Sequence, residues 1–176
     1  MMRPLKNLHK KVNIRAICDQ NIELATKVAS QHGVLNAYTT LSEAFAAHKV
    51  DLVCVSTPHS AHYEVAKLAL ENDCSVIIEK PFTETLEQAN ELMELSAARG
   101  KAIVVMHNHK FYRGMVEGKK LLETSDIGSI VNVHCNWISS SHNRMVSNPD
   151  HWVHDEKGGI FKEVLPHALY GTYSLL

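Results

Sequence analysis

Four groups of polar residues each follow a predicted β-strand, and their side chains suit the binding of a small polar ligand. In an open parallel sheet the carboxyl ends of the strands meet at one edge, and ligands bind beyond that edge. Carboxylate, hydroxyl, ammonium and amide groups gathered there could bind a ligand and transfer protons. We therefore expect one site built from several strands. The four groups are Asp19, Ser56-Thr57-Pro58, Glu79-Lys80-Pro81 and Asn108.

Lys80 stands between Glu79 and Pro81, directly after a predicted strand. A proline in this place removes a backbone donor and can hold a cis bond, so it fixes the direction in which the lysine leaves the strand. The sequence therefore predicts that Lys80 points into the site. The alternative is a solvated surface lysine, which is the usual environment of this residue type.

A second candidate cluster lies near the end of the chain, where Glu163 and His167 are four residues apart. On a helix this spacing puts both side chains on one face. A carboxylate beside an imidazole can hold a general base near neutral pH. Pro166 fits such a helix only near its start. The alternative is that Glu163 and His167 are an ordinary pair of surface side chains on a helix. The spacing by itself favours this alternative.

The twelve histidines raise the question of a metal site. The spacings most like those of metal ligands are His107-x-His109, and His151-x-x-His154 followed by Asp155. No set of three or four ligands has the spacing of a known zinc motif, so we expect no bound metal.

Short β-branched runs alternate with amphipathic helical stretches, which is typical of βαβ units and an α/β fold with a parallel sheet. An alternating strand over 130–137 has the period-two pattern of a half-exposed sheet, so the architecture changes near Gly128. A further helix is expected to begin with Ser60 as its N-cap. The other predicted strands cover residues 12–19, 51–56, 74–78 and 101–106, and the other predicted helices cover 22–32, 41–48, 86–99 and 115–124.

Asp19 ends the first of these strands. At the end of the second strand of a dinucleotide-binding fold, a carboxylate accepts hydrogen bonds from the adenosine ribose and repels a 2′-phosphate. This position favours NAD over NADP. The alternative is that Asp19 is only the N-cap of the next helix.

Composition excludes several other classes of partner. The chain has 18 Lys and Arg against 19 Asp and Glu, with no basic block that could follow a phosphate backbone, so we expect no nucleic acid partner. Its apolar runs are far shorter than the roughly 20 residues that span a bilayer. No apolar signal-peptide region follows the N-terminal lysines, so a cytoplasmic location is expected.

Two runs of residues resemble the Gfo/Idh/MocA family of nicotinamide-dependent oxidoreductases. They are VCVSTPHSAH over 53–62 and VIIEKP over 76–81. Asn108-His109-Lys110-Phe111 stands where the family has an N-x-R-F-like segment, and Gly158-Gly159 begins its glycine-rich segment before the catalytic helix.

The resemblance implies a dehydrogenase that acts on sugars, polyols and related alcohols. In this family the lysine at the position of Lys80 contacts substrate and helps to position the nicotinamide. The positions of Glu163 and His167 bind and deprotonate the substrate hydroxyl, so the resemblance makes His167 the general base. Glu163 replaces the usual aspartate, and its carboxylate reaches about 1.5 Å further, which implies an altered substrate or weakened activity. The expected cofactor-binding residues are Asp19, Ser56, Thr57, Pro58, His62, Glu79, Lys80 and Asn108.

The sequence also departs from the family pattern. None of its eight glycines has the G-x-G-x-x-G spacing that cradles a pyrophosphate. We therefore expect a chain truncated at both ends. It would consist of an incomplete Rossmann-like domain over 1–126, with helices on both faces of a parallel sheet, and the start of an α+β substrate domain over 127–176.

Two functional interpretations follow from these observations. The first is an NAD-dependent sugar or polyol oxidoreductase. The second is an inactive remnant that acts as a binding or oligomerisation module, because the loss of a first strand would leave neighbouring strands unpaired and apolar surface exposed.

Overall fold

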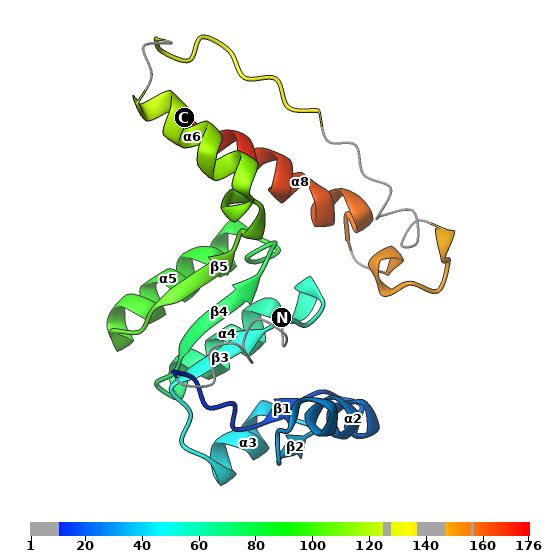
Figure 1. The fold of residues 1–176 in the computed structure, drawn as a ribbon. Helices are drawn as coiled ribbons and strands as arrows, with labels where there is room; N and C mark the ends of the chain where they lie inside the picture. The colour runs from blue at the N-terminus through cyan, green and yellow to red at the C-terminus, as the bar shows by residue number, and fades with distance from the viewer. Residues whose placement is uncertain (1–10, 125–127, 137–146, 156) are drawn as a thin grey trace.

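The computed structural model describes residues 11–124, 128–136, 147–155 and 157–176, and within these ranges short parallel strands alternate with helices (Figure 1). The predicted parallel α/β arrangement is thereby confirmed. The strands are β1 (Ile17–Cys18), β2 (Ala37–Tyr38), β3 (Leu52–Val55), β4 (Ser75–Glu79) and β5 (Ile103–Met106).

The strands form two parallel sheets. In the smaller sheet Ile17 of β1 lies opposite Ala37 of β2. In the larger sheet β4 is central, since Val76 lies opposite Val53 of β3 and opposite Ile103 of β5. Every pairing is parallel, so the carboxyl ends of β3, β4 and β5 lie at the same edge of the larger sheet.

Local capping signals in the sequence set several of the helix boundaries. The helices are α2 (Ile22–His32), α3 (Leu41–Ala47), α4 (His62–Glu71), α5 (Leu86–Arg99), α6 (Arg113–Thr124) and α8 (Gly159–Tyr173). The Thr40 and Thr85 side chains form capping boxes with Glu43 and Gln88. The prediction that Ser60 caps α4 is wrong, because a short 3₁₀ turn, η1 (His59–Ala61), precedes the helix.

The hydrophobic core lies on one face of the larger sheet. Alternate residues of β3 and β4 point into it, and α4 and α5 cover it. The period-two pattern of a strand explains this alternation. The fully or nearly buried members are Val53, Val55, Ala66, Ala69, Leu70, Cys74, Val76, Ile78 and Leu92.

Leu92 offers a direct test of this core, because its side chain is 0% exposed. We expect Leu92→Ala to lower the free energy of unfolding by about 2–5 kcal/mol, through lost burial and the cavity left behind. Met93 is the matched control, since it is the next residue of α5 and is 57% exposed. Urea unfolding would measure both variants, and equal losses would contradict the assigned core.

The C-terminal segment differs from the prediction in two places. Residues 130–136 form no strand, because no described segment pairs with them, and residue 137 lies outside the described residues. Pro166 lies inside α8 rather than near its start, although proline cannot donate a backbone hydrogen bond there. The helix α8 contacts α6 where the Lys119 ammonium donates to the carbonyl of Ser174 at 3.0 Å.

Among the described residues, no helix combines the length and the apolar character needed to span a bilayer.

Candidate functional site

A small cavity of about 140 Å³ lies at the carboxyl ends of β3 and β4. Ser56 and Thr57 reach it from the end of β3, Glu79 and Lys80 come from the end of β4, and α8 contributes Glu163. Residues from two of the four predicted strand-end groups therefore meet at one site. The full lining is Ser56, Thr57, His59, His62, Glu79, Lys80 and Glu163.

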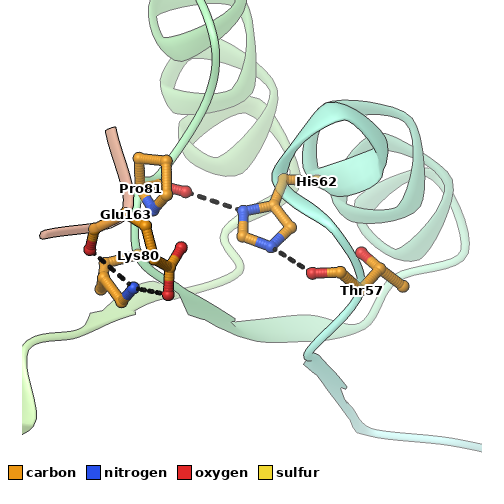
Figure 2. A network of polar contacts seen from close by, with 5 residues as sticks. All are labelled: Thr57, His62, Lys80, Pro81 and Glu163. Carbon is orange, nitrogen blue, oxygen red and sulfur yellow. Dashed lines mark hydrogen bonds and ion pairs between the residues drawn. The ribbon is translucent and has the colours of Figure 1, made fainter. Parts of the chain in front are cut away.

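Lys80 points into this site and is only 8% exposed, so the alternative of a solvated surface lysine is wrong. Its ammonium group donates to the backbone carbonyl of Glu163 at 2.9 Å and also to the Glu163 carboxylate (Figure 2). The peptide bond between Lys80 and Pro81 is cis.

The Glu163 side chain is 16% exposed and forms an ion pair with Lys80. Taking two opposite charges out of water together is much less costly than burying one of them alone. A second, weaker ion pair joins Lys162 to Glu84, with 3.8 Å between the ammonium and carboxylate atoms. The two ion pairs hold the first turns of α8 against the loop that follows β4.

His167 does not line this cavity, but it lies on the same helix as Glu163. Its ring stacks on that of His109, with centroids 4.0 Å apart and an angle of 11° between the planes. His107 stacks in the same way on Tyr170 at 3.6 Å and 7°. Two ring stacks therefore join α8 to the end of β5 and to η2 (Asn108–Phe111).

His107 and His109 thus have a packing role that their spacing did not reveal. Burial lowers the pKa of His107, and the nearby positive charge of Lys110 acts in the same direction. The described residues contain no group of three or more side chains placed to hold a metal ion. The H-x-H spacing was visible in the sequence, whereas the aromatic partners on α8 were not.

Three of the predicted cofactor-binding residues lie outside the cavity lining. Asn108 begins η2 one residue beyond the end of β5, with His107 between them, and Pro58 precedes η1. Asp19 follows β1, where its carboxylate accepts the N–H of Asn21 at 2.9 Å. The alternative that Asp19 caps α2 is wrong, because Asn21 is the N-cap and accepts the N–H of Leu24.

His62 was predicted to bind cofactor, and the structure shows where its ring nitrogens lie. Nδ1 is 2.7 Å from the carbonyl oxygen of Pro81, and Nε2 is 3.1 Å from that of Thr57 (Figure 2). The ring is 1% exposed. His59, which the sequence analysis did not select, is also buried and lines the same cavity. Its place directly after Thr57-Pro58, at a strand end, was the signal that could have found it.

The donor set fits two parts of a dinucleotide. The Asp19 carboxylate follows β1, and in dinucleotide-binding folds a carboxylate at a strand end accepts hydrogen bonds from the ribose. The hydroxyls and the ammonium at the ends of β3 and β4 suit the nicotinamide end of the dinucleotide. The 176 residues contain no G-x-G-x-x-G loop to cradle the pyrophosphate.

Comparison with known proteins supports the resemblance in the sequence. The family model described as an oxidoreductase family with an NAD-binding Rossmann fold, Gfo/Idh/MocA, matches residues 1–107. An uncharacterized oxidoreductase of Schizosaccharomyces pombe is 32% identical over 128 residues, which are 72% of this chain and 35% of that protein. Inositol 2-dehydrogenase of Renibacterium salmoninarum is 30% identical over 135 residues, which are 74% of this chain and 40% of the enzyme.

A solved structure shows the same fold over nearly the whole chain. GenD2 from gentamicin A biosynthesis, in complex with NAD, superposes with a TM-score of 0.80 at 22% identity and covers 99% of this chain and 49% of GenD2. The chain thus spans less than half the length of each of these three proteins. It belongs to the Gfo/Idh/MocA family of oxidoreductases with an NAD-binding Rossmann fold.

Proposed function

We propose that this chain acts in an NAD-dependent dehydrogenase that oxidises a secondary hydroxyl of a sugar or polyol. The observation that carries the proposal is the buried Lys80–Glu163 ion pair in a cavity at the ends of two parallel strands. The relative that acts on inositol supports a polyol substrate, and the neighbour solved with NAD supports the cofactor.

The strand ends supply the groups that would hold NAD. Asp19 would accept hydrogen bonds from the ribose hydroxyls, and the Thr57 and Lys80 region would lie toward the nicotinamide. NAD, when bound, supplies the acceptor for the hydride that leaves the carbinol carbon. The other residues assigned to this site are Ser56, Pro58, His62, Glu79 and Asn108.

The residues of the chain supply the acid–base chemistry. Lys80 carries a positive charge that stabilises negative charge developing on the substrate oxygen, and it orients the hydroxyl together with Glu163. His167 accepts the hydroxyl proton as the general base. A substrate hydroxyl that binds Lys80 must compete with the Glu163 carboxylate, which already accepts a hydrogen bond from it.

The extra methylene of Glu163 affects this competition. In the structure the Glu163 carboxylate is in direct contact with the Lys80 ammonium. A substrate that displaces this contact must offer its own acceptor to Lys80.

Titration of NADH into the folded chain tests the proposal. We expect saturable binding, followed by fluorescence of the nicotinamide, and weaker binding of NADPH because a carboxylate at Asp19 repels the 2′-phosphate. Asp19→Ala should reduce the preference for NADH over NADPH. Turnover would be sought with NAD and a panel of inositols and sugars.

Two outcomes would contradict these expectations. A chain that circular dichroism shows to be folded, yet binds neither dinucleotide, would contradict the proposed function. An unchanged NADH to NADPH ratio in Asp19→Ala would show that this carboxylate only orients the start of α2. Asp51→Ala is the matched control, since it removes a carboxylate next to β3, away from the carboxyl end of that strand.

A further inference from the structure

His62 is buried although it is the first residue of α4, and its ring lies between two backbone segments of the site. Figure 2 shows Nδ1 directed at the Pro81 carbonyl and Nε2 at the Thr57 carbonyl. The two N···O distances, 2.7 and 3.1 Å, are both hydrogen-bond distances. One ring therefore bridges the segment that follows β3 and the segment that follows Lys80.

The two partners of this ring are of the same chemical kind. Backbone carbonyl oxygens only accept hydrogen bonds, so each contact needs an N–H on the imidazole. A neutral imidazole has one N–H and satisfies one carbonyl at a time. Both carbonyls are in reach of the ring, and both contacts are hydrogen bonds only when both nitrogens carry an N–H.

The cavity beside the ring is lined by charged groups of both signs. Lys80 and His59 line the same cavity, as do the carboxylates of Glu79 and Glu163. The Glu163 carboxylate already pairs with Lys80. Glu79 adds a second carboxylate to the lining of the same cavity.

The bridge joins two parts of the site that the proposed function uses for different purposes. Thr57 belongs to the segment assigned to the cofactor, and Pro81 directly follows the lysine assigned to the substrate. We propose that His62 is a positioning residue that donates from both ring nitrogens and so holds the Thr57 segment and Lys80 in a fixed relation. This inference rests on the proposed function.

Three substitutions separate the two halves of the bridge. His62→Asn keeps a donor near the position of Nδ1, toward Pro81, whereas His62→Gln keeps one near Nε2, toward Thr57. His62→Leu removes both donors at similar size. A lost buried hydrogen bond typically changes an equilibrium or a rate by roughly tenfold.

The expected effects differ between the variants. His62→Asn should weaken NADH binding about tenfold and leave kcat within about threefold, because the bond to Pro81 remains. His62→Gln should lower kcat about tenfold with NADH binding nearly unchanged, because the bond to Thr57 remains. His62→Leu should show both losses. The Kd of NADH, kcat and the urea midpoint would be measured for each.

Ser96→Ala is the matched control, because Ser96 is also a buried side chain that donates to a backbone carbonyl, that of Lys101, away from the cavity. We expect it to lower the urea midpoint without changing Kd or kcat. If all three His62 variants behave in this way, His62 has only a structural role and the proposal is overturned.

A spectroscopic measurement decides the inference without any turnover. Long-range ¹⁵N–¹H correlation of the ¹⁵N-histidine-labelled chain, with His62→Leu to assign the signals, reports which ring nitrogens carry a proton. Two protonated nitrogens on His62 are expected, and the pattern of a single neutral tautomer overturns the proposal. If the wild-type chain neither binds NADH nor turns over, the proposed function fails, while this spectrum still decides the state of His62.

Discussion

Replacing Lys80 by methionine is expected to lower kcat for the polyol substrate at least about a hundredfold, while the Kd of NADH stays within about threefold. Methionine keeps much of the side-chain length but removes the positive charge that stabilises negative charge on the substrate oxygen. The Lys80 side chain is 8% exposed, so the charge acts in a partly desolvated site where electrostatic interactions are strong. Steady-state turnover and NADH titration measure the two quantities separately.

The same substitution leaves the Glu163 carboxylate without its positive partner. We expect Lys80→Met to lower the free energy of unfolding by about 3 kcal/mol, since breaking a buried ion pair strands one charge. The double variant Lys80→Met with Glu163→Gln removes both charges and should recover stability to within about 1 kcal/mol, but not turnover. Urea unfolding of the wild-type chain and of both variants tests this. Full turnover in either variant would exclude Lys80 from the reaction.

Replacing His167 by asparagine or phenylalanine is expected to lower kcat about a hundred- to ten-thousandfold, because the substrate hydroxyl loses its general base. Phenylalanine preserves a flat ring that can stack on His109, so it separates the loss of the base from the loss of packing. In the wild-type chain kcat should fall toward acidic pH, because protonation disables a general base. Both variants should lack this fall.

The matched control is His48→Asn. His48 hydrogen-bonds the hydroxyl of Tyr38 at 2.9 Å beside the smaller sheet, outside the cavity, so its loss should leave kcat and the pH profile unchanged. Turnover of both His167 variants at the wild-type rate would show that another group takes the proton. A low rate in His167→Asn with a normal rate in His167→Phe would mean that the ring stack matters and the imidazole nitrogens do not.

The sequence determined most of the secondary structure because the signals are local. Capping boxes at Thr40 and Thr85 start α3 and α5, and Gly33 and Gly100 end α2 and α5 with positive φ angles of 68° and 60°. The runs 51–56, 74–78 and 101–106 became strands at nearly the expected places. The run 12–19 is an exception, since only Ile17–Cys18 finds ladder partners, on β2.

The edge on which the cavity lies could also be predicted from the sequence. Parallel strands place their carboxyl ends together, so Ser56, Thr57, Glu79 and Lys80 had to come close once the fold class was known. The motif around Lys80 also indicated the family, which the match over residues 1–107 confirmed. The division into domains at residue 126 and the preference for NAD remain predictions.

Tertiary structure alone decided the contacts between distant segments. A strand needs a neighbour to accept its backbone hydrogen bonds, so the alternating pattern of 130–136 could not make a strand by itself. The Lys80–Glu163 ion pair and the His109–His167 stack depend on where α8 packs, which no local spacing encodes. His62 has both its carbonyl partners only because the segments after β3 and β4 converge on the start of α4.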